Sequence, residues 1–373
     1  MLMRLVSLLV AIAGFAVVHI VPAAADAPTR WPVRDGVFHA KHFRFDSGET
    51  LADLRLHYLT LGTPRRDREG HVTNAVLLLH GTGGNGHTLL NPIFSDVLFG
   101  PGQPLDITKY FIILPDDIGQ GESSKPSDGL RMKFPRYTYS DMVRSQHLML
   151  IDGLHVDHLR LVLGTSMGCM QAFVWGETYP KYVDALMPLA CMPMEIAGRN
   201  RMWRYMAMQC IRNDPAWNNG NYSSEPMEGL RCAAHMLMIA VSAPQQMQKD
   251  FPTRRQAEDY VDRTVNSIAS HTDADDFLYY FDASRNYNPE PHLGSIIAPV
   301  MWVNSADDFI NPPELRDLAQ KLAARMPRAR FVLIPASLHT YGHGTHTHAA
   351  VWEQYLVELL KESANRNGRA GGP

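Results

Sequence analysis

The sequence predicts an α/β protein with a mostly parallel central sheet, helices on both of its faces and a helical cap insertion. Three observations predict this class. Short apolar runs recur along the chain, helix-like segments separate several of them, and the strand signal disappears between residues 192 and 293. The 373-residue chain is long enough for one large domain with an insertion, and two separate domains are the alternative.

The first two strands are predicted at residues 39–45 and 54–61, where apolar and polar residues alternate on either side of a turn. Such alternation is typical of an antiparallel pair at a sheet edge, with one face in water. The later apolar runs fit parallel strands that are covered on both faces. They lie at 75–79, 110–114, 159–163, 185–190, 300–303 and 331–334. Helices are predicted at 139–153, 167–179 and about 349–360.

The cap is predicted to comprise residues 192–293, which leaves residues 26–191 and 294–365 for the core. The segment is helix-like and rich in methionine. Met202 and Met206 are four residues apart, as are Trp203 and Ala207, which is the spacing of a buried helix face. We therefore expect these methionines in a core. An adaptable apolar pocket is the alternative, because thioether side chains are flexible.

The N-terminus has the pattern of a secretory signal peptide over residues 1–25. Arg4 gives it a positive start, residues 5–21 are almost wholly apolar, and Ala23-Ala24-Ala25 offers a cleavage site. An uncleaved membrane anchor is the alternative, because the apolar run is close to the minimum of roughly 17 residues for a span. We expect an exported protein, periplasmic or secreted, with no stable membrane association once the leader is cleaved.

Charge and cysteine content limit which partners, disulfides and metal sites are expected. The formal charge of -3 provides no basic surface for nucleic acid, so nucleic acid is not an expected partner. Cys169, Cys191, Cys210 and Cys232 are too few for a disulfide framework at this length, and we favour buried free thiols. A bridge between Cys210 and Cys232 is the alternative. No pair has the C-x-x-C spacing of a zinc site.

The candidate nucleophile is Ser166. The segment Gly164-Thr165-Ser166-Met167-Gly168 follows the apolar run 159–163 and opens a helix-like segment. This order of strand, sharp turn and helix is the context of a nucleophile elbow, which exposes the serine at the edge of the sheet. Glycines suit the tight turn, because side chains at 164 and 168 would crowd the backbone.

A serine hydroxyl needs an imidazole to accept its proton, and the imidazole needs a carboxylate to orient it. Two aspartates, Asp307 and Asp308, follow the apolar run 300–303, and we choose Asp308. The segment 339–348 follows the last predicted strand and contains four histidines, of which His343 is the candidate base because glycines flank it. A zinc or copper site is the alternative for these histidines, although no acidic or cysteine ligand is interleaved.

An oxyanion requires a second backbone N–H besides that of Met167. The loop 80–84, His-Gly-Thr-Gly-Gly, directly follows the predicted strand 75–79, and Thr82 is the candidate donor. A phosphate-binding loop is the alternative, but the G-x-G-x-x-G spacing and the Walker lysine are missing. The loop 116–121 is interpreted as a structural turn. We expect no cofactor and no metal.

Further motifs carry a family resemblance. They are Gly100-Pro101-Gly102, Pro104-Leu105-Asp106, Asp141-Met142-Val143, Gly164 to Gln171, Asp214-Pro215-Ala216-Trp217 and Asp308-Phe309-Ile310-Asn311-Pro312. With these motifs the chain resembles the α/β-hydrolase superfamily, specifically its homoserine O-acetyltransferase branch. The resemblance covers most of the chain after residue 26. It implies an α/β-hydrolase fold and places Ser166, Asp308 and His343 at the family's catalytic positions.

Two departures from that branch concern the substrate. The loop 80–84 resembles that of ordinary hydrolases, whereas the transferases resemble H-A-L-T-G there. An arginine that we expect in the cap helix, suited to gripping an amino-acid carboxylate, falls at Met208, so homoserine would lose a charge-assisted clamp. Arg201 and Arg204 are the candidates to compensate for it.

The sequence therefore favours an exported serine hydrolase that cleaves a carboxylic ester, or a related acyl bond, through an acyl-Ser166 intermediate. Its expected partner is a small acyl ester, and a homodimer is left open. An O-acyltransferase of the homoserine O-acetyltransferase type is the alternative, ranked second because an exported enzyme has no access to cytoplasmic acyl-CoA. A non-catalytic or metal-binding protein on the same scaffold is a third hypothesis.

Overall fold

The computed structural model describes residues 30–367, so the predicted signal peptide at 1–25 lies outside the described residues. One eight-stranded sheet has the order β1-β2-β4-β3-β5-β6-β7-β8. β1 pairs antiparallel with β2, β2 pairs antiparallel with β4, and the other neighbours are parallel. The strands are β1 Arg34–Arg44, β2 Thr50–Leu61, β3 Ala75–Leu79, β4 Phe111–Pro115, β5 Leu161–Thr165, β6 Leu186–Leu189, β7 Val300–Ser305 and β8 Ala329–Ile334. The predicted mostly parallel sheet is confirmed.

The inner parallel strands are buried on both faces, as their continuous apolar runs predict. The same prediction is wrong for the run 331–334, because β8 lies at the sheet edge and is only partly buried. In β3, Ala75, Leu77 and Leu79 enter one core, and Val76 and Leu78 enter the other. Residues of α2, α3 and α9 belong to the first core, and residues of α1 and α10 belong to the second. These helices are α1 Pro92–Leu98, α2 Tyr139–Leu148, α3 Met167–Thr178, α9 Arg316–Ala323 and α10 Glu353–Asn367.

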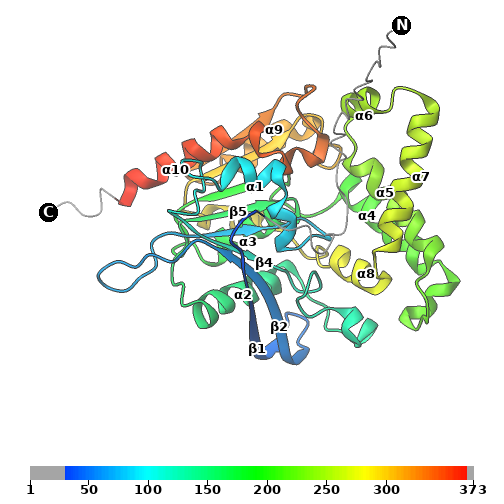
Figure 1. The fold of residues 1–373 in the computed structure, drawn as a ribbon, viewed down its shortest axis with the longest axis horizontal. Coiled ribbons are helices and arrows are strands. Elements are labelled where there is room, and N and C mark those ends of the chain that lie inside the picture. The colour runs from blue at the N-terminus through cyan, green and yellow to red at the C-terminus, as the bar shows by residue number, and fades with distance from the viewer. Residues whose placement is uncertain (1–29, 368–373) are drawn as a thin grey trace, which may run out of the picture.

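The cap segment contains helices α4 Gly198–Arg212, α5 Met227–Val241, α6 Pro244–Asp250, α7 Arg254–Ser270 and α8 Ala274–Asp282. They follow β6, precede β7 and lie together at one side of the sheet (Figure 1). The sequence predicts that two faces of α4 are buried, and this prediction is wrong for one of them. Trp203 and Ala207 are buried, whereas Met202 is 62% exposed and Met206 is 46% exposed. Helix α4 packs against α5 and α8, which leaves the methionine face uncovered.

The prediction of free thiols is wrong. Cys169 is bonded to Cys191, and Cys210 is bonded to Cys232. The Cα atoms of the two pairs lie 5.9 and 5.5 Å apart, which is ordinary disulfide spacing. Cysteine content gave no indication of the first pair, because its two halves come from α3 and from the loop after β6. The fold brings them together.

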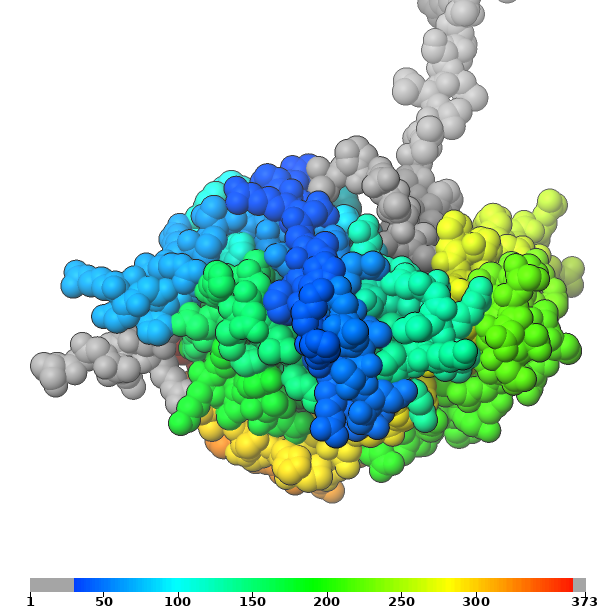
Figure 2. Space-filling view, turned by 90° about the horizontal axis from the view of Figure 1, so that it is seen from below, coloured from blue at the N-terminus to red at the C-terminus, as the bar shows by residue number. Residues whose placement is uncertain are grey.

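The antiparallel pair at the start of the described chain forms one edge of the sheet. Figure 2 shows this β1–β2 hairpin along the surface of the core, with the cap set to one side. The turn between the strands contains Gly48 at a φ of +89°, a conformation that glycine adopts at little cost. Among residues 30–367, no helix combines the length and the apolar character that spanning a bilayer requires.

Candidate active site

The nucleophile elbow is built as its glycines predict. β5 ends at Thr165, α3 begins at Met167, and Ser166 between them has a φ of +54°. A Cβ at position 164 would lie 1.9 Å from the Gly168 carbonyl oxygen, and a Cβ at 168 would lie 2.3 Å from the Leu79 carbonyl oxygen. Neither position therefore accepts a side chain. The strain at Ser166 is held by the strand and the helix on either side.

The structure brings together the three side chains that the sequence selects. Ser166 Oγ lies 2.7 Å from His343 Nε2, across 177 residues of chain. His343 Nδ1 lies 2.9 Å from Asp308 Oδ2. Ser166 is 9% exposed and His343 is 5% exposed, so the pair is nearly removed from water. In this arrangement the imidazole can take a proton from the serine hydroxyl while the carboxylate fixes its other nitrogen.

The loop that follows β7, here called the acid loop, contains Asp307 and Asp308, and each aspartate has its own set of contacts. Burial would raise the pKa of Asp308, but His343, Asn311 and the Ile310 N–H favour its ionised form, and the net pKa falls below the ordinary value. Asp307 instead accepts hydrogen bonds from Thr340 Oγ1 at 2.8 Å and from the Gly342 N–H at 3.0 Å. It therefore anchors the loop that presents the imidazole, a role that sequence reasoning did not assign.

The loop 80–84 lies against the nucleophile. A Cβ at Gly81 would be 3.4 Å from that of Ser166, and the Gly168 N–H donates to the His80 carbonyl at 3.0 Å. The Met167 N–H opens α3 and has no partner within the helix. Thr82 lies next to Gly81 in this loop, and its hydroxyl is buried without a hydrogen-bond partner among residues 30–367. The Thr82 and Met167 N–H groups remain the candidate oxyanion donors.

A buried glutamine lies between the loop 80–84 and the first residue of α3. Gln120 is 4% exposed, its Oε1 accepts from the Gly83 N–H at 2.7 Å, and its Nε2 lies 3.4 Å from Met167 Sδ. It therefore contacts the residue after Thr82 and the residue after Ser166. Sequence reasoning interpreted the loop 116–121 as a structural turn, because nothing in its local pattern shows what its side chains contact.

Beneath Gln120, a second buried network supports the same loops. Burial raises the pKa of Asp117, which accepts hydrogen bonds from Gln146 and Gln171, each at 2.6 Å. Trp175 donates to Gln146 at 2.7 Å. The Asp117 N–H donates to His80 Nε2 at 3.2 Å. These bonds tie α2 and α3 to the start of the loop 80–84.

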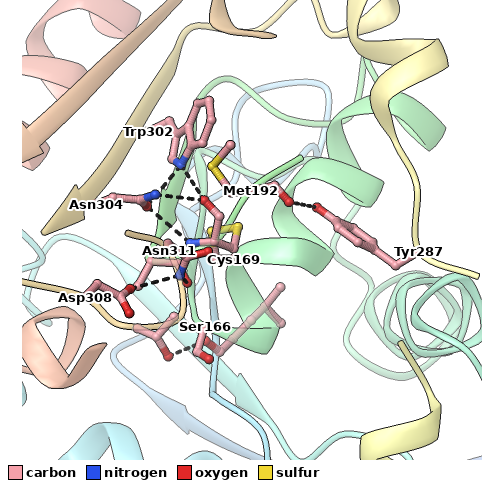
Figure 3. Close-up of a disulfide and its surroundings, with 12 residues drawn as sticks. Ser166, Cys169, Met192, Tyr287, Trp302, Asn304, Asp308 and Asn311 are labelled. Carbon is pink, nitrogen blue, oxygen red and sulfur yellow. Dashed lines mark hydrogen bonds between the residues drawn. A yellow bond between two sulfur atoms is a disulfide. The ribbon is translucent and has the colours of Figure 1, made fainter. Parts of the chain in front are cut away.

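The Cys169–Cys191 disulfide joins the first turn of α3 to the loop after β6, close to Ser166 (Figure 3). The Cys191 carbonyl accepts hydrogen bonds from Trp302 Nε1 at 2.9 Å and Asn304 Nδ2 at 3.1 Å. One residue earlier, the carbonyl of residue 190 accepts from Asn311 Nδ2, which also donates to Asp308 Oδ2 at 2.9 Å. The nucleophile helix and the acid loop are thus held by one connected set of bonds.

The clustered histidines do not assemble a metal site in the described chain. Over residues 30–367, no group of three or more His, Cys, Asp or Glu side chains is placed to hold a metal ion. His346 lies edge-on to His343, with ring centres 5.1 Å apart, and burial lowers its pKa well below the usual range. His348 stacks on Tyr341.

The fold and the site define a class of protein. The family model for the alpha/beta hydrolase fold matches residues 74–341, and the chain belongs to this family of enzymes. Within it, the chain belongs to the branch of the homoserine O-acetyltransferases. The homoserine O-acetyltransferase of Geobacter sulfurreducens is 30% identical over 339 residues, covering 80% of this chain and 89% of the relative. The homoserine O-succinyltransferase of Magnetococcus marinus is 30% identical over 300 residues, covering 70% and 75%.

Solved structures show the same fold. A homoserine O-acetyltransferase from Bacillus anthracis superimposes with a TM-score of 0.75 at 23% identity, covering 88% of this chain and 97% of that chain. An acetylester hydrolase from Corynebacterium glutamicum gives a TM-score of 0.76 at 22% identity, covering 88% and 96%.

These comparisons correct the favoured reaction. The relatives near 30% identity are named acyltransferases, so the expectation that water is the acyl acceptor is wrong, and the alternative is better supported. Their names give no indication of export either. The structures named esterases or hydrolases fall below 25% identity and share the fold alone. Sequence reasoning erred because hydrolysis and transfer use the same acyl-serine intermediate, so catalytic side chains do not reveal the acceptor.

Proposed function

We propose that this protein is an O-acyltransferase of the homoserine O-acetyltransferase type, which works through an acyl-Ser166 intermediate. The observation that carries the proposal is the hydrogen-bonded line from Ser166 Oγ through His343 to Asp308, in a chain whose relatives at 30% identity are named homoserine acyltransferases. Homoserine is the first acceptor to test, and an acyl ester or thioester is the donor.

In the first half of the proposed reaction, Ser166 Oγ attacks the donor carbonyl carbon while His343 Nε2 takes the hydroxyl proton. His343 then returns this proton to the alcohol or thiol that leaves. Asp308 stays ionised and stabilises the imidazolium. The Thr82 and Met167 N–H groups bind the oxyanion, and loss of one such donor is expected to cost roughly 10²-fold or more in kcat.

In the second half, the acceptor hydroxyl replaces the first leaving group. His343 Nε2 takes the proton of this hydroxyl, the acceptor oxygen attacks the acyl carbon, and the bond to Ser166 Oγ breaks. Ser166 recovers its proton from His343. The product is the acylated acceptor, and the enzyme returns to its starting state without gain or loss of atoms. The low exposure of Ser166 and His343 supports this reading, because it limits the access of competing water.

The test is product analysis with and without Ser166. Purified enzyme receives p-nitrophenyl acetate and homoserine, and mass spectrometry quantifies O-acetylhomoserine and free acetate. The proposal expects the ester product to form in amounts that rise with homoserine concentration. Ser166→Ala should abolish both product and acyl-enzyme, while its circular dichroism matches the wild type. Release of acetate alone, at every acceptor concentration, would contradict transfer, and turnover by Ser166→Ala would contradict the nucleophile.

We further propose that the protein acts in an oxidising compartment after export. The signal-peptide pattern at 1–25 motivates this, and the two disulfides support it, because structural disulfides persist mainly outside the reducing cytosol. The acyl donor in such a compartment is an ester or thioester other than cytoplasmic acyl-CoA. N-terminal sequencing of the mature protein checks this proposal, and a start near residue 26 is expected.

A further inference from the structure

A second imidazole lies between carboxylates, away from the Ser166, His343 and Asp308 side chains. His57 lies in β2, its side chain is 3% exposed, and its Nδ1 lies 2.9 Å from Asp116 Oδ2. Its Nε2 lies 3.2 Å from Oδ1 of Asp35 in β1, whose side chain is 70% exposed. Asp116 itself is buried. The contacts therefore run from the surface, through a buried imidazole, to a buried carboxylate.

These two carboxylates require a proton on each ring nitrogen of His57. An ionised carboxylate only accepts hydrogen bonds, and an imidazole donates from both nitrogens only when it is positively charged. Burial alone would lower the pKa of the imidazole, but Asp116, Asp35 and Glu122 raise it above the ordinary value. Burial would raise the pKa of Asp116, but the imidazole and two backbone N–H groups lower it. Below the pKa of His57, the pair is therefore an imidazolium and a carboxylate.

Other titratable groups face this pair from neighbouring elements. His87 is exposed in the 3-10 helix Gly86–Leu90, and its ring is parallel to that of His57, with centres 6.4 Å apart. His80 faces Asp116 from the loop 80–84. The charge of Glu122, in the loop after β4, also raises the pKa of His57. Loss of the His57 proton is the titration that changes the hydrogen bonds of Asp116.

Asp116 holds the two loops that surround the candidate oxyanion donors. Its Oδ1 accepts from the Gly86 N–H at 2.7 Å, just beyond the loop 80–84. Its Oδ2 accepts from the Glu122 N–H at 2.8 Å, just beyond Gln120. Gln120 in turn accepts from the Gly83 N–H at 2.7 Å. One carboxylate thus connects both loops from the side opposite to their mutual hydrogen bond.

We propose that His57 is a positioning residue for the acyl-serine reaction: as an imidazolium it holds Asp116, and through Asp116 it holds the loop that carries the Thr82 N–H. This inference rests on the proposed acyl-serine function. A neutral imidazole has one N–H for two carboxylates, and its bond to Asp116 is no longer charge-assisted. The loops then lose part of their support, and a misplaced donor raises the barrier.

The proposal predicts a second limb in the pH profile. The acidic limb belongs to His343, which acts as a base only when it is unprotonated. On the alkaline side, activity is expected to fall as His57 loses its proton. The measurements are kcat for p-nitrophenyl acetate and the rate at which a fluorophosphonate labels Ser166, each between about pH 5 and about pH 9.

Three variants assign the alkaline limb. Asp35→Asn changes an exposed side chain and should move the limb to lower pH by roughly half a unit or more, because the imidazolium loses a carboxylate partner. His57→Asn places an amide nitrogen as many bonds from Cα as Nδ1, so it should keep kcat at neutral pH and abolish the limb. His57→Leu should lower kcat roughly 10-fold at every pH, with little change in KM.

The matched control is another imidazole–carboxylate pair on the same β1–β2 hairpin. His39 Nδ1 lies 3.0 Å from Asp53 Oδ1, and the two side chains are 47% and 43% exposed. Asp53→Asn removes the same charge as Asp35→Asn and is expected to leave kcat and its pH profile unchanged. A shift of the alkaline limb equal to that of Asp35→Asn would assign the effect to surface charge and overturn the positioning role.

Nuclear magnetic resonance of Ser166→Ala follows the His57 ring without turnover, and His57→Asn in the same background assigns its signal. We expect a titration midpoint above 6.5 that falls with Asp35→Asn, and an alkaline limb that moves with it. A midpoint at or below 6.5, or a limb that stays in place while the midpoint moves, overturns the proposal. Neither readout needs an acyl acceptor, so its failure is distinct from a failure of transfer to homoserine. Absence of labelling at every pH would overturn both the nucleophile and this role.

Discussion

The two disulfides have the same sequence separation, 22 residues, but lie in different regions. Cys169–Cys191 links the helix behind Ser166 to the loop after β6, whose carbonyls accept from Asn304 in β7 and from Asn311 in the acid loop. Cys210–Cys232 links α4 to α5 within the cap. Chain entropy gives each link a similar effect on stability, about 3 kcal/mol for such a loop. Only the first link also joins parts of the candidate active site, so the comparison separates stability from catalytic geometry.

Removing each disulfide in turn tests whether stability and catalytic geometry can be separated in this way. The losses of stability from these two changes are the largest effects that we expect. The double variants Cys169→Ala with Cys191→Ala, and Cys210→Ala with Cys232→Ala, should each lose about 3 kcal/mol of unfolding free energy in urea titrations. Under native conditions the first should also lose about tenfold in kcat, because misplaced reacting groups raise the barrier by a kcal/mol or more.

The cap variant is the matched control for this experiment. Its kcat should stay near that of the wild type, because Cys210 and Cys232 lie within the cap helices and outside the set of bonds that surrounds Ser166. Equal losses of kcat in both double variants would break the comparison. Such equal losses would mean that breaking the cap disulfide disturbs the geometry at Ser166 as much as breaking the core disulfide does.

Buried polar groups in the candidate site and in the cap can also be compared by whether they have hydrogen-bond partners. Around Ser166, the buried groups Asp117, Gln120 and Asp308 all have hydrogen-bond partners. In the cap, Trp203 Nε1 has none in the described chain, and at the site itself the Thr82 hydroxyl has none either. Paired groups fix a geometry, whereas unpaired donors are costly unless a ligand completes them.

Gln120→Leu tests whether the pairing around the nucleophile positions the oxyanion donors. The variant cannot hold the Gly83 N–H or contact Met167, so both candidate donors lose a support. We expect kcat to fall roughly 10- to 30-fold with little change in KM, a fraction of the loss for a missing donor, since the N–H groups themselves remain. Steady-state kinetics with a neutral ester measures both constants.

Gln103→Leu provides the control, because Gln103, in the loop after α1, likewise accepts a bond from a glycine N–H and uses its amide nitrogen as a donor. Its Oε1 accepts from the Gly100 N–H, and its Nε2 donates to the Asp96 carbonyl. It should lose stability without a comparable loss of kcat. If Gln120→Leu changed the melting temperature alone, Gln120 would be a structural residue and the positioning role would be lost.

Sequence reasoning succeeded where a local pattern fixes the physics. Period-two alternation and apolar runs determined the sheet, and two glycines that admit no Cβ determined the elbow at Ser166. It failed where the outcome depends on contacts between distant segments. Neither the Cys169–Cys191 bond nor the contacts of Gln120 leave a local signature, because each partner is chosen by the three-dimensional packing. The exposed face of α4 was missed for the same reason.

The smallest expected effect concerns Glu177, a partly buried acid whose charge acts on Tyr287. Burial raises the pKa of Glu177 from 4.5 to about 7, and its Oε2 has no partner in the described chain. Between these two values the folded protein binds more protons than the unfolded chain, so the free energy of unfolding falls as the pH rises. Because the side chain is partly exposed, solvent screening limits this loss to about 1 kcal/mol.

Glu177→Gln should therefore flatten the dependence of stability on pH, with its gain over the wild type largest above about pH 7. Urea unfolding at about pH 5 and about pH 8 measures this difference, and Glu314→Gln, at an exposed position, is the control. Asp308 has the opposite sign: its lowered pKa gives stability that is lost as the pH falls below the usual carboxyl range. An unchanged slope in Glu177→Gln would mean that this acid is ionised throughout, and that its unpaired oxygen costs less than its burial indicates.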